Sequence, residues 1–83
     1  MTYAIEFSEP AEKQFRKLEK SVQERIFLAL ERIKIRPYDF VKKLVGVPYY
    51  RFRVGDYRII LDIRNDKLII FVIEVGHRKN IYK

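Results

Sequence analysis

The chain has 83 residues, the length of one small domain, and a formal net charge of +7. Its apolar fraction of 48% is enough to build a core, which argues against a disordered polypeptide, and the absence of cysteine excludes disulfides and thiolate metal sites. The excess of lysine and arginine favours a polyanionic partner, either nucleic acid or an acidic protein. We therefore expect a single basic domain over residues 1–83.

The chain opens with a predicted strand and a short predicted helix. Residues 3–7 alternate between apolar and polar side chains, which is typical of a half-buried strand. Ser8 is a suitable N-cap for a helix over residues 9–19. The apolar side of that helix is expected to comprise Ala11, Phe15 and Leu18.

A second helix is predicted to follow. Ser21 and Glu24 have the spacing of a capping box, in which each side chain binds a backbone amide of the other residue, so the helix should start there. Pro37 should end it near Ile35, because the residue before a proline avoids the α region. Its apolar stripe is expected to comprise Val22, Ile26, Ala29, Leu30 and Ile33.

The C-terminal half predicts three strands. Residues 38–48 are interpreted as a connection, a hairpin with a turn at Gly55 and Asp56 follows, and residues 64–67 form a second polar turn. Residues 68–75 are apolar on both faces, which places this last strand in the centre of the sheet. The order β-α-α-β-β-β predicts an α+β fold with two N-terminal helices packed on a mostly antiparallel four-stranded sheet. The other face of that sheet stays free for a site.

The hairpin gathers arginine residues on the expected free face. A two-residue turn sets Arg53 opposite Arg58, and Arg51 lies on the same face because side chains alternate along a strand. Like charges directly across a sheet repel each other, so this arrangement indicates a bound anion. The alternative is a solvated strand face on which Asp62 neutralises Arg58. The opposite, apolar face is expected to comprise Tyr50, Phe52, Val54, Tyr57, Ile59, Leu61 and Ile63.

The C-terminal segment carries the only histidine of the chain, next to another arginine. Gly76 allows a sharp exit from the last strand, and His77, Arg78 and Tyr82 follow it. Histidine titrates near neutral pH, arginine binds phosphate through a bidentate fork, and tyrosine stacks on bases. A lone surface histidine is more often an ordinary polar residue, but its combination with the arginine face favours RNA chemistry.

Several of these segments together resemble one known family. They are residues 3–7, 43–46, 50–58 and 75–78, with Tyr82 near the end. In this order and spacing they are similar to the RelE-type toxins of the RelE/ParE superfamily, the small basic toxins of prokaryotic toxin–antitoxin pairs. The resemblance covers nearly the whole chain and is more specific for the superfamily than for its activity.

The resemblance implies a fold like that of microbial ribonucleases and a ribosome-dependent endonuclease that cuts mRNA in the A site. The ribose 2′-hydroxyl would attack the adjacent phosphate, the 5′-oxygen would leave, and a 2′,3′-cyclic phosphate would result, with no metal or other cofactor. The implied partners are an acidic antitoxin, the ribosome and mRNA.

The resemblance also implies roles for single residues. Arg51 and Arg53 stand where RelE toxins place basic residues near the attacking hydroxyl, and Arg58 matches the arginine that contacts the scissile phosphate. Arg78 matches the arginine assigned to the phosphate and the leaving oxygen, and Tyr82 matches a tyrosine that orients the substrate or stacks on it. Fixed positive charge around a phosphate is also what phosphoryl transfer requires. Further contacts to the RNA backbone are expected from Lys42, Lys43 and Lys79.

This chain departs from the best-known RelE pattern, which has lysines in place of Arg51 and Arg53. Arginine effectively cannot lose its proton, so this strand lacks a general base. His77 is the obvious substitute, because the imidazole of histidine titrates near neutral pH. Without such a role for His77, this version would be weak or inactive.

Two other functions stay open. A ParE-like protein would share the fold but inhibit DNA gyrase instead of cutting RNA. A catalytically inactive module would bind nucleic acid or an antitoxin. An RNA-cleavage assay separates both from a RelE-type nuclease.

The sequence favours a cytoplasmic protein with no membrane partner. An acidic residue at position 6 interrupts the first apolar stretch, so no signal peptide is predicted. The longest apolar run, residues 68–73, is far shorter than the ~20 residues that span a bilayer.

Overall fold

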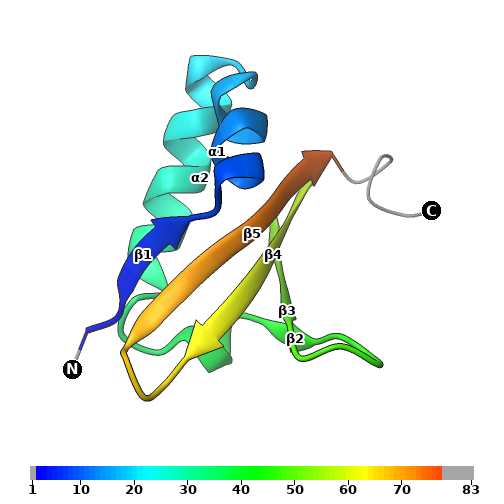
Figure 1. Cartoon of the computed structure of the whole chain (residues 1–83). Coiled ribbons are helices and arrows are strands. Elements are labelled where there is room, and N and C mark those ends of the chain that lie inside the picture. The colour runs from blue at the N-terminus through cyan, green and yellow to red at the C-terminus, as the bar shows by residue number, and fades with distance from the viewer. Residues whose placement is uncertain (1, 78–83) are drawn as a thin grey trace.

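Two helices cover one face of a five-stranded sheet in the computed structural model, which describes residues 2–77 (Figure 1). In chain order the elements are β1 (Ala4–Phe7), α1 (Glu9–Arg16), α2 (Lys20–Arg32), the 3₁₀ helix η1 (Pro37–Asp39), β2 (Lys42–Lys43), β3 (Tyr50–Val54), β4 (Tyr57–Arg64) and β5 (Ile69–His77). The strand order is β1-β5-β4-β3-β2, in which β1 runs parallel to β5 and the other neighbours are antiparallel. No helix in this part of the chain is long and apolar enough to cross a membrane.

The predicted α+β class is confirmed, but the sheet has one strand more than predicted, and its central strand is β4, with the last strand β5 internal and next to it. The additional strand, β2, falls inside the segment 38–48 that the sequence favours as a connection. Its two lysines show no apolar alternation of their own. They form a strand because they pair with Arg51 and Tyr50 of β3. The pairing with β3 therefore determines that this short edge segment is a strand. The alternation of side chains within the segment itself cannot predict such a strand.

Ser8 caps α1 as predicted, whereas the capping box predicted at the start of α2 is wrong. The Ser8 hydroxyl oxygen accepts a hydrogen bond from the backbone amide three residues on, at 3.2 Å. α2 starts one residue before Ser21, with Glu19 as its N-cap and no side-chain capping bond, so Ser21 lies within the first turn. The side-chain amide of Gln23 instead donates to the Leu18 carbonyl oxygen at 2.8 Å and ties α2 to the link that precedes it.

Both helices are shorter than predicted, ending at Arg16 and at Arg32. After α2, the Lys34 carbonyl oxygen accepts a hydrogen bond from the Tyr3 amide at 2.9 Å, which ties this link to the start of β1. The amides of Ile33 and Lys34 donate to carbonyl oxygens three residues back, so the last turn tightens and the helix ends before Pro37 is reached.

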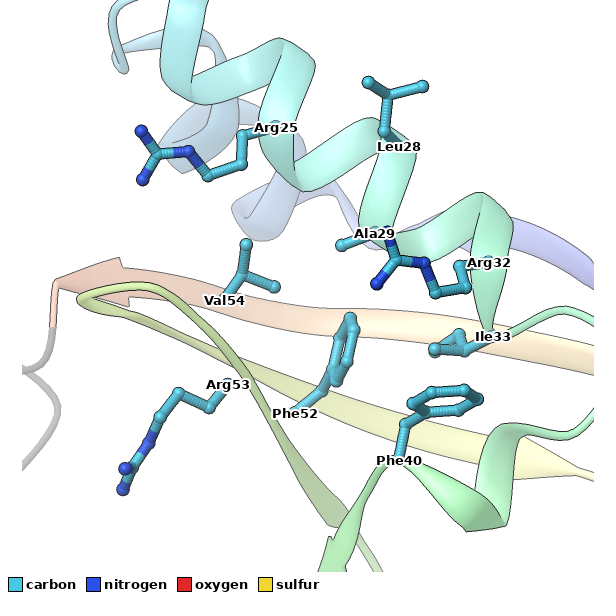
Figure 2. A pocket seen from close by; sticks show the side chains of 9 residues that line it. All are labelled: Arg25, Leu28, Ala29, Arg32, Ile33, Phe40, Phe52, Arg53 and Val54. Atoms are coloured by element: carbon cyan, nitrogen blue, oxygen red, sulfur yellow. The ribbon is translucent and has the colours of Figure 1, made fainter.

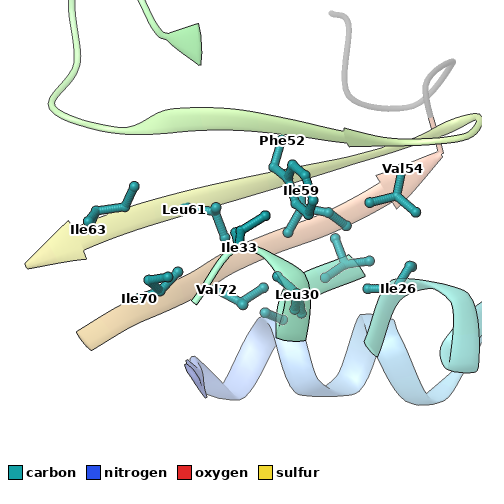
Figure 3. Packing of buried hydrophobic residues seen from close by; sticks show 12 residues of the cluster. Ile26, Leu30, Ile33, Phe52, Val54, Ile59, Leu61, Ile63, Ile70 and Val72 are labelled. Carbon is teal, nitrogen blue, oxygen red and sulfur yellow. The ribbon is translucent and has the colours of Figure 1, made fainter. Parts of the chain in front are cut away.

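The core lies between the helices and the inner face of the sheet (Figure 3). On β5, Val72 and Val75 are both buried although they are three residues apart. The register between β4 and β5 shifts after Ile60, and this bulge leaves Ile73 without an opposite residue and returns Val75 to the inner face. The Ser8 hydroxyl donates to the Ile73 carbonyl oxygen at 3.1 Å. The buried cluster comprises Ala11, Ile26, Leu30, Ile33, Phe52, Val54, Ile59, Leu61, Ile63, Ile70, Val72 and Val75.

Replacing Ser8 by alanine is expected to lower the free energy of unfolding by about 1–2 kcal/mol. The change removes the cap of α1 and the hydrogen bond to the bulged residue Ile73. Ser21→Ala is the matched control, because α2 has no side-chain cap; it should change the free energy by less than about 0.5 kcal/mol. Urea unfolding measures both variants, and equal losses would contradict this difference between the two helix starts.

Candidate functional site

The predicted arginine face forms on the side of the sheet away from the helices. Arg53 of β3 lies directly opposite Arg58 of β4, and Arg51 precedes Arg53 by two residues on β3. This register depends on the turn between the strands, where Gly55 has φ +58°. A positive φ at the first of two turn residues suits a hairpin and favours glycine there. The predicted hairpin and its register are therefore confirmed.

Burial differs among the three arginines. Arg53 is exposed and Arg51 is half-buried, but Arg58 is only 4% exposed and is the one buried charged residue within residues 2–77. On its other side Arg58 pairs with Gly76 of β5, which has no side chain and leaves room for a guanidinium. Because Arg58 is buried, water screens the charge of its guanidinium only weakly.

A small pocket on the same face adds a lysine to the arginines. Lys42 lies opposite Arg51 in the β2–β3 pair. Lys43 does not join them, because its Nζ lies 5.3 Å from the centre of the Tyr50 ring in a cation–π contact. Lys42 and Lys43, both predicted to bind RNA, thus point to opposite faces of β2. The pocket has a volume of about 220 Å³ and is lined by Phe40, Lys42, Arg51 and Arg53.

Phe40 is the member of this pocket that sequence reasoning missed. It is 46% exposed and lies between η1 and β2. An aromatic ring beside several cations is the combination with which proteins stack nucleobases and hold their phosphates. The only sequence signal is an aromatic residue two positions before Lys42, and such a residue in a link is as often a packing residue.

Asp62, which neutralises Arg58 in the alternative interpretation, forms an ion pair with Arg64. Asp62 accepts a hydrogen bond from Nε of Arg64 at 2.9 Å, and this bond raises the pKa of the Arg64 guanidinium. Neither Arg51 nor Arg53 forms an ion pair within the described part of the chain. The charges of these two arginines are therefore available to an anion.

His77 lies on the opposite side of the sheet from the arginines. β5 continues through Gly76 to His77, so the predicted end of this strand at residue 75 is wrong, and the chain does not use the sharp exit that Gly76 allows. His77 pairs with Tyr57, and the two rings meet edge to face with their centroids 5.3 Å apart. Both side chains line a pocket of about 400 Å³ that Gln14 of α1 borders. Tyr57 packs against the core, so its cross-strand partner His77 also faces the helices, whereas Arg58 faces away from them.

The remaining predicted site residues, Arg78, Lys79 and Tyr82, lie outside the described residues. Among residues 2–77, no group of three or more His, Cys, Asp or Glu side chains could hold a metal ion. The described site is a cationic sheet face. It comprises the buried Arg58, the better exposed Arg51 and Arg53, and Lys42. Such a face can bind phosphate through charge and through forked hydrogen bonds.

Comparison with known proteins finds relatives among bacterial and archaeal toxins. A sequence model of the family described as "ParE toxin of type II toxin-antitoxin system, parDE" matches residues 5–82. The mRNA interferase toxin RelE of Escherichia coli is 33% identical over 82 residues, which cover 95% of this chain and 86% of the relative. The intact RelBE toxin–antitoxin complex of E. coli superposes with a TM-score of 0.79 at 31% identity, covering 90% of this chain and 95% of that one. The archaeal RelE–RelB complex of Pyrococcus horikoshii gives a TM-score of 0.80 at 26% identity, with 96% and 99% covered.

Proposed function

The chain belongs to the RelE/ParE family of toxins from type II toxin–antitoxin systems, and we propose that it is a ribosome-dependent endonuclease that cuts mRNA in the A site. The observation that carries this proposal is the pair of Arg53 and Arg58 on the sheet face away from the helices, with Arg51 and Lys42 beside it. A face of this charge fits a single RNA strand held by its phosphates. The E. coli relative is named an mRNA interferase, which supports cleavage as the outcome of binding.

In the proposed reaction the ribose 2′-hydroxyl attacks the adjacent phosphorus, the bond to the 5′-oxygen breaks, and a 2′,3′-cyclic phosphate forms. Arg58 is proposed to bind the phosphate oxygens, on which negative charge grows in the transition state. Arg51 and Arg53 are proposed to lie near the attacking hydroxyl, Arg78 at the leaving oxygen, and Tyr82 against a base. This charge stabilisation uses side chains alone and invokes no metal or other cofactor.

The same reaction moves two protons, one from the 2′-hydroxyl and one to the 5′-oxygen. Arg51 and Arg53 cannot accept the first, because arginine does not lose its proton. His77 is proposed for proton transfer on the basis of its chemistry. Because its ring contacts Tyr57 on the helix side, we expect His77 to contribute less to the rate than Arg58 does.

We further propose an acidic antitoxin as the partner that silences the chain. Solved relatives include toxin–antitoxin complexes from a bacterium and an archaeon. A net charge of +7 attracts an acidic protein and speeds its association. The proposed targets, ribosomes and mRNA, place the activity in the cytoplasm.

Gyrase inhibition is the second candidate function, because the matching family model is described by the ParE toxin. A protein of that kind would need no RNA-binding face. The charge gathered around Arg58 and the RelE relative at 33% identity both favour RNA cleavage. A supercoiling assay with purified DNA gyrase tests this second candidate directly.

Adding the purified chain to ribosomes paused on a defined mRNA tests the first candidate. We expect new 3′ ends confined to the A-site codon and ending in a 2′,3′-cyclic phosphate. His77→Gln should lower the cleavage rate by less than Arg58→Ala does, because the imidazole faces away from the arginines. Absence of cleavage at every codon would contradict the nuclease proposal, and inhibition of gyrase in the parallel assay would then support the alternative.

A further inference from the structure

Glu74 places an exposed carboxylate on the sheet face that carries the arginines. It lies directly opposite Ile60 of β4, and cross-strand partners point to the same face of a sheet. Ile60 faces away from the helices, because the residues on either side of it, Ile59 and Leu61, belong to the core cluster. Figure 2 shows the same alternation on β3, where Arg53 extends away from α2. Glu74 and Arg53 therefore face the same side.

Two rows of residues cross this face from β3 to β5. In the first row, Arg51 and Glu74 lie on the two sides of Ile60. The second row, two residues further along the strands, comprises Arg53, Arg58 and Gly76. Neighbouring strands are about 4.8 Å apart, so the backbones of Arg51 and Glu74 are separated by about 10 Å, and Glu74 is a diagonal neighbour of Arg58 at roughly 7–8 Å. A phosphate bound to Arg58 would thus lie beside the Glu74 carboxylate.

The Glu74 carboxylate has no ion-pair partner among residues 2–77, although Arg58 is a neighbour on the same face. Asp62 of this face shows the contrasting case, because it is paired with Arg64 at 2.9 Å. Lys17 of α1 lines a pocket together with Glu74, and the two side chains do not form an ion pair either. The carboxylate is therefore open to a substrate group that binds over β4.

Cleavage through the 2′-hydroxyl needs a proton acceptor on this face. The arginines cannot accept the proton, and His77 lies on the helix side of the sheet, where its ring contacts Tyr57. A carboxylate within hydrogen-bond reach of a hydroxyl is suited to this task. We propose that Glu74 is the general base that takes the proton of the 2′-hydroxyl. The inference rests on the proposed function, because it assigns a role in that cleavage of RNA.

The proton of the 2′-hydroxyl passes to a carboxylate oxygen of Glu74 while the 2′-oxygen forms its bond to phosphorus. The bond between phosphorus and the 5′-oxygen breaks, and the 5′-oxygen takes a proton from solvent water. Glu74 then returns its proton to the solvent, so the reaction neither gains nor loses a proton. Arg58 offsets the repulsion between the carboxylate and the phosphate, since its positive charge lies next to both.

Glu74→Gln tests this role, because the amide keeps the shape of the side chain and no longer accepts the proton. We expect the single-turnover cleavage rate on paused ribosomes to fall at least about 100-fold. Glu6→Gln is the matched control, since Glu6 is an exposed carboxylate on the same sheet face, opposite Phe71 of β5. It should change the rate by less than about threefold. Both variants lose one negative charge, so neither should bind ribosomes more weakly, whereas Arg58→Ala should.

Chemical rescue separates a general base from a residue that only positions Arg58. Glu74→Ala leaves space for a small carboxylate, so added formate should raise its cleavage rate at least about tenfold. Chloride at equal ionic strength is the control, because salt weakens binding to RNA. Formate should not raise the rate of Arg58→Ala. Glu74→Asp keeps a carboxylate that is one methylene shorter, and its rate should lie between the rates of Glu74→Ala and of the unaltered chain.

The outcomes separate this inference from the proposed function. Cleavage by Glu74→Gln at close to the unaltered rate would overturn the role of Glu74 and leave the nuclease proposal standing. A loss of rate in Glu74→Ala that formate does not reverse would also overturn it. Absence of cleavage by the unaltered chain would overturn both proposals. Circular dichroism of every variant controls for the fold, which we expect to be kept because Glu74 is exposed.

Discussion

Replacing Arg58 by alanine is expected to reduce mRNA cleavage on ribosomes by at least about 100-fold. Arg58 is 4% exposed and lies between Arg53 and Gly76 in the sheet, so its charge acts where water screens it weakly. Alanine removes both this charge and the forked hydrogen-bond donor. Arg58→Lys keeps a positive charge but loses the forked hydrogen-bond donor. Its cleavage rate should therefore fall between the rates of Arg58→Ala and of the unaltered chain. Single-turnover cleavage on paused ribosomes measures each rate.

Arg64→Ala is the matched control for Arg58→Ala. Both arginines belong to β4 and lie on the same face, since they are six positions apart, but Arg64 is exposed and forms an ion pair with Asp62. Its loss should change the cleavage rate by less than about threefold. Urea unfolding of both variants distinguishes lost catalysis from a lost fold. Equal rates for Arg58→Ala and the unaltered chain would contradict the role proposed for Arg58.

The arginine hairpin could be predicted from the sequence because every local signal agrees there. Basic and apolar residues alternate on both sides of Gly55, and a two-residue turn then fixes which residues oppose each other. The burial of Arg58 could not be predicted in this way. Arg58 pairs with Gly76 of β5, and that pairing joins segments whose relation no local pattern encodes.

The position of His77 shows how one bulge changes the side of the sheet that a residue faces. With strict alternation from Val72, His77 would face outward with the arginines. The bulge at Ile73 reverses the alternation, so that Val75 and His77 both face the helices. Gly76 permits a sharp exit from the strand but does not require one, and its pairing with Arg58 keeps the backbone extended. A bulge of this kind has no clear sequence signal in a uniformly apolar strand.

Leu30→Ala is expected to lower the free energy of unfolding by about 2–5 kcal/mol. Leu30 of α2 is 1% exposed and belongs to the cluster that joins the helices to β3, β4 and β5. Truncation removes its contacts and leaves a cavity, because the surrounding sheet relaxes only in part. A domain of 83 residues has a total stability of roughly 4–12 kcal/mol, so the loss is a large share of it.

Leu28→Ala is the control on the same helix, because Leu28 is 65% exposed and should contribute less than about 0.5 kcal/mol to stability. At a temperature where all variants are folded, Leu30→Ala should cleave mRNA at close to the unaltered rate, since Leu30 packs on the inner face and the arginines lie on the outer face. Arg58→Ala should show the opposite behaviour: the protein should stay folded but lose most of its cleavage rate. Urea unfolding and cleavage measured on the same samples compare the two directly. Folded Leu30→Ala could instead lose as much cleavage rate as Arg58→Ala does. That result would mean that helix packing sets the geometry of the arginines. It would contradict a separation between an inner face that stabilises the fold and an outer face that carries the reaction.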